Sequence, residues 1–119
     1  MSYDIRLKDP ITKETLELDT PHQMRGGTYA MGGTEQCWLN ITYNYAKFWE
    51  KAFGEKGHIR GIYGKSAVDT IPILEKAISN LGDDVDDNYW KPTEGNVKAA
   101  LIQLLALAKL RPDGIWEGD

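Results

Sequence analysis

Residues 93–116 read TEGNVKAALIQLLALAKLRPDGIW and form the most regular segment of the chain. Thr93 is suited to cap a helix, because its side-chain oxygen can accept a hydrogen bond from an N–H group of the first turn. Pro112 marks the end, since proline cannot continue a helix. Between them the apolar residues recur at helical spacing, at Val97, Leu101, Leu104, Leu105 and Ala108. The segment predicts a helix, after which Ile115 and Trp116 return to a sheet.

Two segments near the start of the chain alternate apolar and polar residues, as half-buried strands do. They are residues 3–8 and 15–19. Asp9 and Pro10 lie between them and favour a turn, because proline fixes φ and restricts the residue before it. We therefore expect an N-terminal hairpin. Residues 28–31, bracketed by two glycine pairs, are a third and shorter strand candidate.

Residues 35–53 carry a helical stripe of apolar side chains, at Ile41, Tyr45, Phe48 and Ala52. Thr34 is the expected cap of this helix and Gly54 its expected stop. The first half is also compatible with a strand, because residues 41–43 read ITY and have high β-propensity.

A further helix is expected over residues 71–81, with Thr70 as its cap and Pro72 in its first turn. Taken together, the elements predict an α+β fold. A small antiparallel sheet, made of the N-terminal hairpin plus one or two short strands, packs against three helices. At 119 residues the chain has material for one core, so we expect a single domain over residues 1–119.

Composition excludes several classes of function. The net charge is -4, which is opposite to the basic surface of proteins that bind double-stranded nucleic acid. No apolar run approaches the ~20 residues that cross a bilayer, and the first residues alternate charge where a signal peptide would be apolar. Cys37 is the only cysteine, so no internal disulfide or thiolate zinc cage can form. We expect a cytoplasmic protein with no membrane partner, metal or cofactor.

Three patterns resemble known functional motifs and fail on inspection. Residues 64–66, GKS, lack the glycine of a phosphate-binding loop, because Ile59 stands at its position. Residues 84–88 have the spacing of a calcium loop, but Tyr89 replaces its glycine and Gly95 its terminal glutamate. The two histidines, His22 and His58, have neither metal-ligand spacing nor a patterned nucleophile. The sequence therefore favours a binding protein over an enzyme, and we assign no catalytic residue.

Two segments are candidates for a binding surface. The glycine-rich residues 26–33 would let the backbone approach a ligand closely, with Arg25 beside them. A polar stripe on the helix expected over 35–53 would carry Asn40, Asn44, Lys47 and Lys51 at successive turns. Both segments also have ordinary structural explanations, as tight turns around a strand and as a solvated helix face.

The string Asn40-Ile41-Thr42-Tyr43-Asn44, with the later alanine- and leucine-rich helix, resembles small proteins of phages and other mobile elements that have no assigned activity. Histidine often replaces Tyr43 in that group. The likeness covers roughly the last two-thirds of the chain. It implies a phage-associated origin. Small phage proteins without catalytic motifs commonly act on host defence, either by sequestering a signalling nucleotide or by occupying a host protein.

Two hypotheses follow. In the first, a small anionic ligand is sequestered between the glycine-rich segment and the first helix, where arginines pair with phosphate, tyrosines stack and asparagines bind polar edges. The expected ligand-binding residues are Arg25, Gly26, Gly27, Tyr29, Asn40, Tyr43, Asn44, Arg60, Tyr63 and Lys65. In the second, exposed aromatic residues and the acidic stretch 83–87 inhibit a host defence enzyme. Self-association into a homo-oligomer is compatible with both.

Overall fold

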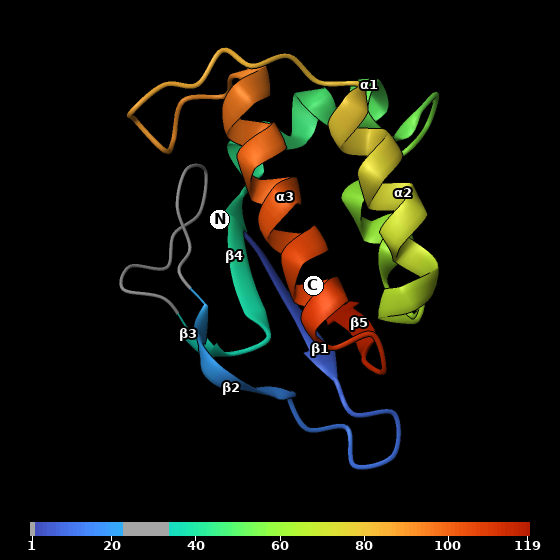
Figure 1. The fold of residues 1–119 in the computed structure, drawn as a ribbon. Coiled ribbons are helices and arrows are strands. Elements are labelled where there is room, and N and C mark those ends of the chain that lie inside the picture. Colours follow the sequence, from blue (N-terminus) through green and yellow to red (C-terminus); the bar gives the residue numbers. More distant parts are fainter. Residues whose placement is uncertain (1, 23–33) are drawn as a thin grey trace.

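The computed structural model describes residues 2–22 and 34–119 (Figure 1). Its centre is a three-stranded antiparallel sheet in which β1 (Ser2–Lys8) lies between β4 (Trp38–Thr42) and β5 (Ile115–Gly118). The alternation in β1 turns Tyr3, Ile5 and Leu7 into the core. Helices cover the buried face of this sheet, which confirms the α+β class. The return of the C-terminal residues to the sheet is also confirmed.

The N-terminal turn forms, but its second arm leaves β1 almost at once. The main-chain N–H of Asp9 donates to the carbonyl of Glu14 over 2.8 Å, and a single bridge joins Lys8 to Thr15. The chain then enters β2 (Glu17–His22), which pairs with β3 (Thr34–Gln36) in a separate two-stranded sheet. The physical reason is that β1 already has a neighbour on each side. The strand predicted at residues 28–31 lies outside the described residues.

The long helix predicted over residues 35–53 is wrong in its first half. That half contains β3 and β4, followed by a 3₁₀ helix, η1 (Tyr43–Phe48), and a short helix, α1 (Trp49–Phe53). Thr34 therefore caps no helix. Instead Thr42 keeps an extended backbone, and its side-chain oxygen accepts from the N–H of Asn44 over 3.2 Å. Gly54 ends α1 at φ 97°, as predicted, because a glycine adopts positive φ at low cost.

The other helices lie close to their predicted positions. α2 (Ala67–Ser79) begins earlier than expected, with Ser66 as its cap, so Pro72 falls inside the helix instead of in its first turn. The expected cap, Thr70, is buried within α2. α3 (Glu94–Leu110) begins after Thr93, as predicted. A second 3₁₀ helix, η2 (Ile59–Ile62), precedes α2.

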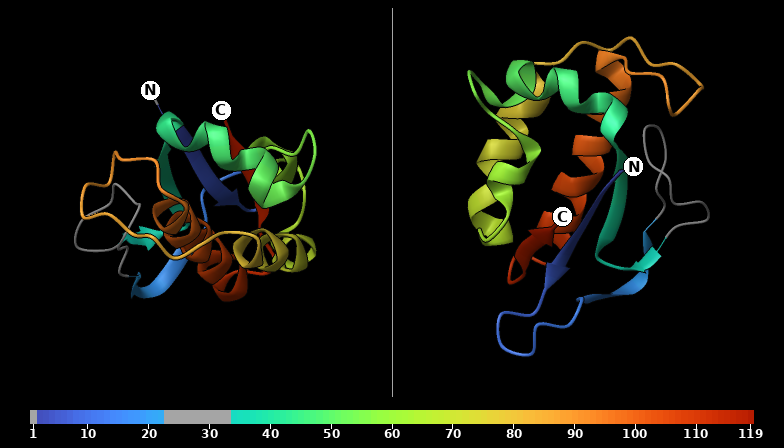
Figure 2. Two further views of the ribbon diagram at one scale, coloured as in Figure 1. Left: turned by 90° about the horizontal axis from the view of Figure 1, so that it is seen from above. Right: turned by 180° about the vertical axis from the view of Figure 1, so that it is seen from behind.

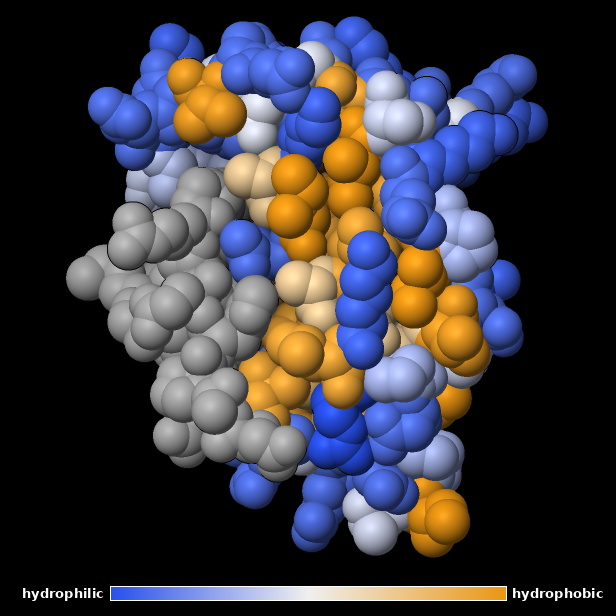
Figure 3. Space-filling view, viewed as in Figure 1, coloured by the Kyte–Doolittle hydropathy of each residue, from blue (hydrophilic) through white to orange (hydrophobic). Residues whose placement is uncertain are grey.

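The elements form two layers. α2 and α3 lie side by side on one face of the three-stranded sheet, and η1 and α1 run across one end of it (Figure 2). The core between the layers is built around Trp49 and Trp116, which are almost fully buried. Apolar side chains also gather on the outward side of α3 and towards α2 (Figure 3). Within the described residues, no helix is both long enough and apolar enough to cross a membrane.

Candidate functional site

Six of the ten predicted site residues are among the residues that the structure describes. Arg25, Gly26, Gly27 and Tyr29 lie outside the described residues, so the glycine-rich side of the predicted pocket has no structural description here. The other six lie on β4, on η1, on η2 and in the segment that joins η2 to α2.

The polar helix stripe is wrong, because its two asparagines are on different elements. Asn40 is on β4, where its amide nitrogen donates to Ser2 Oγ over 2.6 Å and to Asp4 Oδ1 over 2.7 Å. Asn44 is in η1 and donates to the carbonyl of Trp90 over 2.9 Å. Lys51, the last member of the stripe, pairs with Glu94. Both carboxamides therefore bond to groups of the chain itself.

Three of the predicted residues do come together. The Arg60 guanidinium carbon lies 5.0 Å from the ring centre of Tyr3 and 5.9 Å from that of Tyr43. Arg60 Nε also donates to the main-chain oxygen of Asp119 over 2.9 Å. The Tyr63 hydroxyl lies 3.5 Å from the same oxygen. Tyr43, Arg60 and Tyr63 thus form a cationic and aromatic cluster beside the sheet, which we name the Arg60 cluster.

The surroundings of the Arg60 cluster are not basic. A shallow hollow of about 300 Å³ lies on the outer face of the sheet. Its lining residues are Asp4, Arg6, Trp38, Glu117, Gly118 and Asp119. Arg6 and Lys8 both bind Glu117, over 2.7 and 2.6 Å, and these bonds lower the pKa of that carboxyl to about 2. An anion in the hollow would meet carboxylates, because Arg6 and Lys8 are already paired with Glu117.

Burial acts on two titratable side chains at the Arg60 cluster, Tyr63 and the neighbouring His58. Burial, with a smaller effect of Asp119, raises the pKa of Tyr63 to about 12. Burial also lowers the pKa of His58, and the charge of Arg60 acts in the same direction. His58 Nδ1 accepts from the main-chain N–H of Arg60 over 3.1 Å, so the ring caps the start of η2. His58 thus has a local structural role.

Lys65 is exposed in the loop before α2, and the described contacts place its backbone against β5. Its carbonyl accepts from the N–H of Trp116 over 3.0 Å, and the N–H of Gly64 donates to the Trp116 carbonyl over 2.8 Å. Ser66 caps α2. The segment 64–66 therefore joins α2 to the sheet.

Residues 83–93 form a second candidate surface, which we name the acidic loop. The conformation of this loop is fixed by Asn96, a fully buried polar residue in the first turn of α3. Asn96 Oδ1 accepts from the N–H of Asp86 over 3.0 Å. Its amide nitrogen donates to the carbonyls of Asn88 and Lys91 over 3.1 and 2.9 Å. One side chain thus fixes three points of the loop backbone.

Other residues fix the far end of the acidic loop against η1. The buried Tyr45 donates its hydroxyl to the carbonyl of Tyr89, and Asn44 donates to the carbonyl of Trp90. Burial raises the pKa of Tyr45 well above its usual range, so the hydroxyl stays protonated and remains a donor. The loop is therefore attached to both α3 and η1.

Side-chain oxygens of the acidic loop accept hydrogen bonds from main-chain N–H groups two or more residues ahead. Asp84 accepts from the N–H of Gly95, Asp86 from that of Asn88, and Asn88 from that of Trp90. These are the residues whose spacing resembles a calcium loop, and their oxygens bond main-chain N–H groups in turns. Among residues 2–22 and 34–119, no group of three or more His, Cys, Asp or Glu side chains is placed to hold a metal ion.

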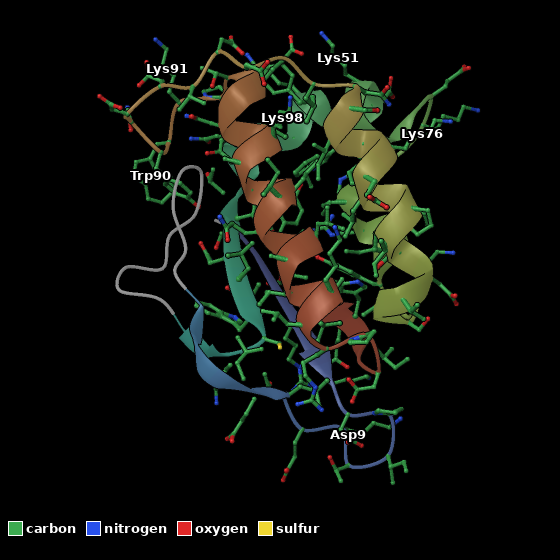
Figure 4. All side chains as sticks on the ribbon, in the orientation of Figure 1. Asp9, Lys51, Lys76, Trp90, Lys91 and Lys98 are labelled. Carbon is green, nitrogen blue, oxygen red and sulfur yellow. The ribbon has the colours of Figure 1, made fainter. Side chains whose placement is uncertain are left out.

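The acidic loop presents a large aromatic residue among carboxylates. Trp90 is 47% exposed, and its ring meets the edge of Tyr89 at 4.7 Å between centres. Figure 4 shows Trp90 on the loop beyond α3. Asp83, Asp84 and Asp87 are exposed nearby.

Sequence analysis recognised the acidic stretch and missed the residues that shape it. Asn96, Tyr45 and Trp90 were not among the predicted site residues. The available signal was the alternation of Asp84, Asp86 and Asn88, because Asp and Asn side chains commonly bond backbone two residues ahead.

Comparison of the chain with known proteins gives no match to a family model, to a curated protein or to a solved structure.

Proposed function

We propose that this chain is a non-enzymatic binding protein that docks onto another protein through the acidic loop. The observation that carries the proposal is the half-exposed Trp90 on a loop that the buried Asn96 fixes at three points. Tryptophan is among the residues that contribute most binding energy at protein interfaces. A loop ordered before binding also loses less conformational entropy when the complex forms.

The charge of the loop indicates the chemistry of the partner. Asp83, Asp84 and Asp87 are exposed around the loop, so the complementary surface is an apolar pocket with a basic rim. The resemblance to phage proteins predicts that this partner is a host defence protein in the cytoplasm. That identity stays a prediction.

The experiment compares binding of a purified host partner, first obtained by capture on the wild-type chain, to three variants. We expect Trp90→Ala to lose about 2 kcal/mol of binding free energy, roughly a thirtyfold rise in Kd. Val68→Ala is the matched control, because Val68 is 52% exposed on α2 and lies outside the acidic loop. Equal affinities for the wild type and Trp90→Ala would refute the proposal.

Charge reversal completes the test. Asp87→Lys should slow association and reduce its dependence on salt, because exposed charges at an interface rim act mainly on the association rate. Asp84 and Asp86 are poorer choices, since their carboxylates bond the N–H groups of Gly95 and Asn88 inside the loop. A change there would alter the shape of the loop together with its charge.

A second candidate function is the sequestration of a small anionic ligand, and the Arg60 cluster favours it. Arg60 lies against Tyr3 and Tyr43, an arrangement that suits a planar anionic ligand such as a nucleotide. Thermal unfolding with a nucleotide panel and with inorganic phosphate tests this function, because a ligand that binds the native state raises the Tm. We expect a shift that Arg60→Gln abolishes, and no shift with any compound would count against it.

A further inference from the structure

The outward side of α3 is apolar. With 3.6 residues per turn, Gly95, Ala99, Ile102, Ala106 and Lys109 follow one line along the helix. Gly95 is buried beneath Val85, and the other four are at least partly exposed. Only the last of these is charged. A helix that is apolar on nearly every side is normally buried on every side. The sheet and α2 cover only part of α3.

Large apolar side chains lie on or beside this line over the full length of the helix. Ile102, at its centre, is 43% exposed, and Leu110, at its C-terminal end, is 53% exposed. At the N-terminal end, Val85 of the preceding loop is 62% exposed. Val85 packs directly against Gly95, because a β-carbon added to Gly95 would lie 2.6 Å from the Val85 nitrogen. We name Val85, Ala99, Ile102, Ala106 and Leu110 the α3 stripe. Figure 3 shows apolar side chains on this face of the molecule.

The α3 stripe is nearly symmetric about Ile102. Gly95, beneath Val85, precedes Ile102 by seven residues, and Leu110 follows it by eight, so both ends lie about 10–12 Å from the centre along the axis. A twofold axis through Ile102 would therefore bring Val85 of one copy onto Leu110 of another.

The charges at the two ends are complementary in the same arrangement. Lys109 is exposed in the last turn of α3. Under the twofold axis it lies opposite Gly95 of the other copy, whose N–H is bonded to the Asp84 carboxylate over 3.1 Å. A lysine thus meets an aspartate at each end of the pair, and opposite charges at an interface fix its register.

We propose that the α3 stripe is a homodimer interface, in which the α3 helices of two copies pack antiparallel about a twofold axis at Ile102. Ile102 then packs against its own copy, and the small Ala99 and Ala106 beside it let the helix axes approach closely. Such a self-complementary contact closes after two copies. One helix per subunit makes a small interface, so the dimer dissociates on dilution.

The mass of the protein in solution tests the interface, measured by sedimentation velocity over a dilution series. We expect the wild type to be dimeric at high concentration and Ile102→Glu to raise the dimer Kd at least tenfold. Ile102→Leu should keep the dimer. Val68→Glu, an exposed apolar position on α2, is the matched control and should also leave the Kd unchanged. A monomeric wild type up to its solubility limit, or a dimer unaffected by Ile102→Glu, would overturn the proposal.

Cross-linking tests the antiparallel register. Position 102 meets itself on the twofold axis, so Ile102→Cys should form an intermolecular disulfide, which requires Cα atoms within about 7 Å. The native Cys37 is fully buried and does not compete. Val68→Cys should cross-link much more slowly, and equal rates at the two positions would contradict the register. The α3 stripe shares Val85 with the acidic loop, and Trp90→Ala and Ile102→Glu separate the two surfaces, because Trp90 lies outside the stripe and Ile102 outside the loop.

Discussion

A fully buried polar contact of the core joins two residues that are far apart in the sequence. The indole nitrogen of Trp116 donates to Thr70 Oγ1 over 2.7 Å, and the Thr70 hydroxyl donates to the carbonyl of Ala67 over 2.8 Å. Both side chains are fully buried. Without the hydroxyl, the indole N–H would have neither this partner nor water, and an unpaired buried donor is costly.

We therefore expect Thr70→Val to lower the free energy of unfolding by about 1–3 kcal/mol, although valine has nearly the same volume. Urea denaturation followed by tryptophan fluorescence measures the loss. Ser79→Ala is the control, because it removes an exposed hydroxyl that bonds a carbonyl of the same helix, and it should change stability by less than about 0.5 kcal/mol. Equal losses of stability in the two variants would show that the buried hydrogen bond of Thr70 stabilises the fold no more than an exposed one.

The Arg60 cluster shows what can be predicted at this scale. Tyr43, Arg60 and Tyr63 were assigned to one pocket from their chemistry alone, and the fold brings them together. Their partners could not be predicted, because the Asp119 oxygen that accepts from Arg60 lies 59 residues away in the chain. Residue type indicates what a side chain can bind, and the fold determines which group it meets.

Among the elements, the acidic loop depends on close contact with the first turn of α3. A β-carbon on Gly95 would lie 2.6 Å from the Asp84 carbonyl carbon and 2.6 Å from the Val85 nitrogen. Main-chain atoms cannot move aside as the end of a flexible side chain can. We therefore expect the added methyl group of Gly95→Ala to push the loop away from α3. Gly61 offers a matched control in η2, because an added β-carbon there meets nothing within 4 Å.

We expect Gly95→Ala to lower the free energy of unfolding by about 1–3 kcal/mol, the usual cost of overpacking, and Gly61→Ala to have little effect. Amide hydrogen exchange should be faster in residues 84–91 of Gly95→Ala than in the wild type, because the loop loses its support. Unchanged exchange in that segment would mean that the loop is not held by its contact with Gly95.

The elements also show where periodicity misleads. The helix after Thr93 was predicted well because its start, apolar stripe and proline stop are all local signals. The helix predicted over residues 35–53 failed because two elements share one apolar pattern. Ile41 is buried by strand pairing with Tyr3, whereas Tyr45 and Ala52 are buried by helical turns. The β-propensity of residues 41–43 allows a strand there, but the change from strand to helix at Thr42 follows from pairing with β1, a contact that no local pattern specifies.

The fold of the whole molecule depends on strand pairs between segments that are far apart in the sequence. β1 joins the middle of the chain, through β4, to its last residues, through β5. On the outer face of the same sheet, Glu117 binds both Arg6 and Lys8, across 111 and 109 residues. These ion pairs link β1 to β5, so the stability of the whole fold is expected to depend on the charge of these groups.

That dependence should appear as a loss of stability in acid. Hydrogen bonds from Lys8 and then Arg6 lower the pKa of Glu117 from 4.5 to about 2, so the folded state binds a proton less readily than the unfolded chain. A carboxylate of this kind contributes fully above pH 4.5, and its contribution disappears as the pH falls towards 2. Asp9, Asp86, Glu94 and Asp113 also have lowered pKa values, from hydrogen bonds to their carboxylates, and act in the same direction.

We therefore expect the urea midpoint of the wild type to fall as the pH is lowered from 5 to 2.5, because these carboxylates titrate in that range. The urea midpoint of Glu117→Gln should fall less over the same range. Glu75→Gln, an exposed change on α2, is the control and should follow the wild-type curve. High salt should narrow the difference between the wild type and Glu117→Gln, because the pair with Arg6 and Lys8 is partly exposed and screened. Parallel curves for the wild type and Glu117→Gln at low salt would show that the contact of Glu117 with Arg6 and Lys8 contributes nothing to the acid response of the fold.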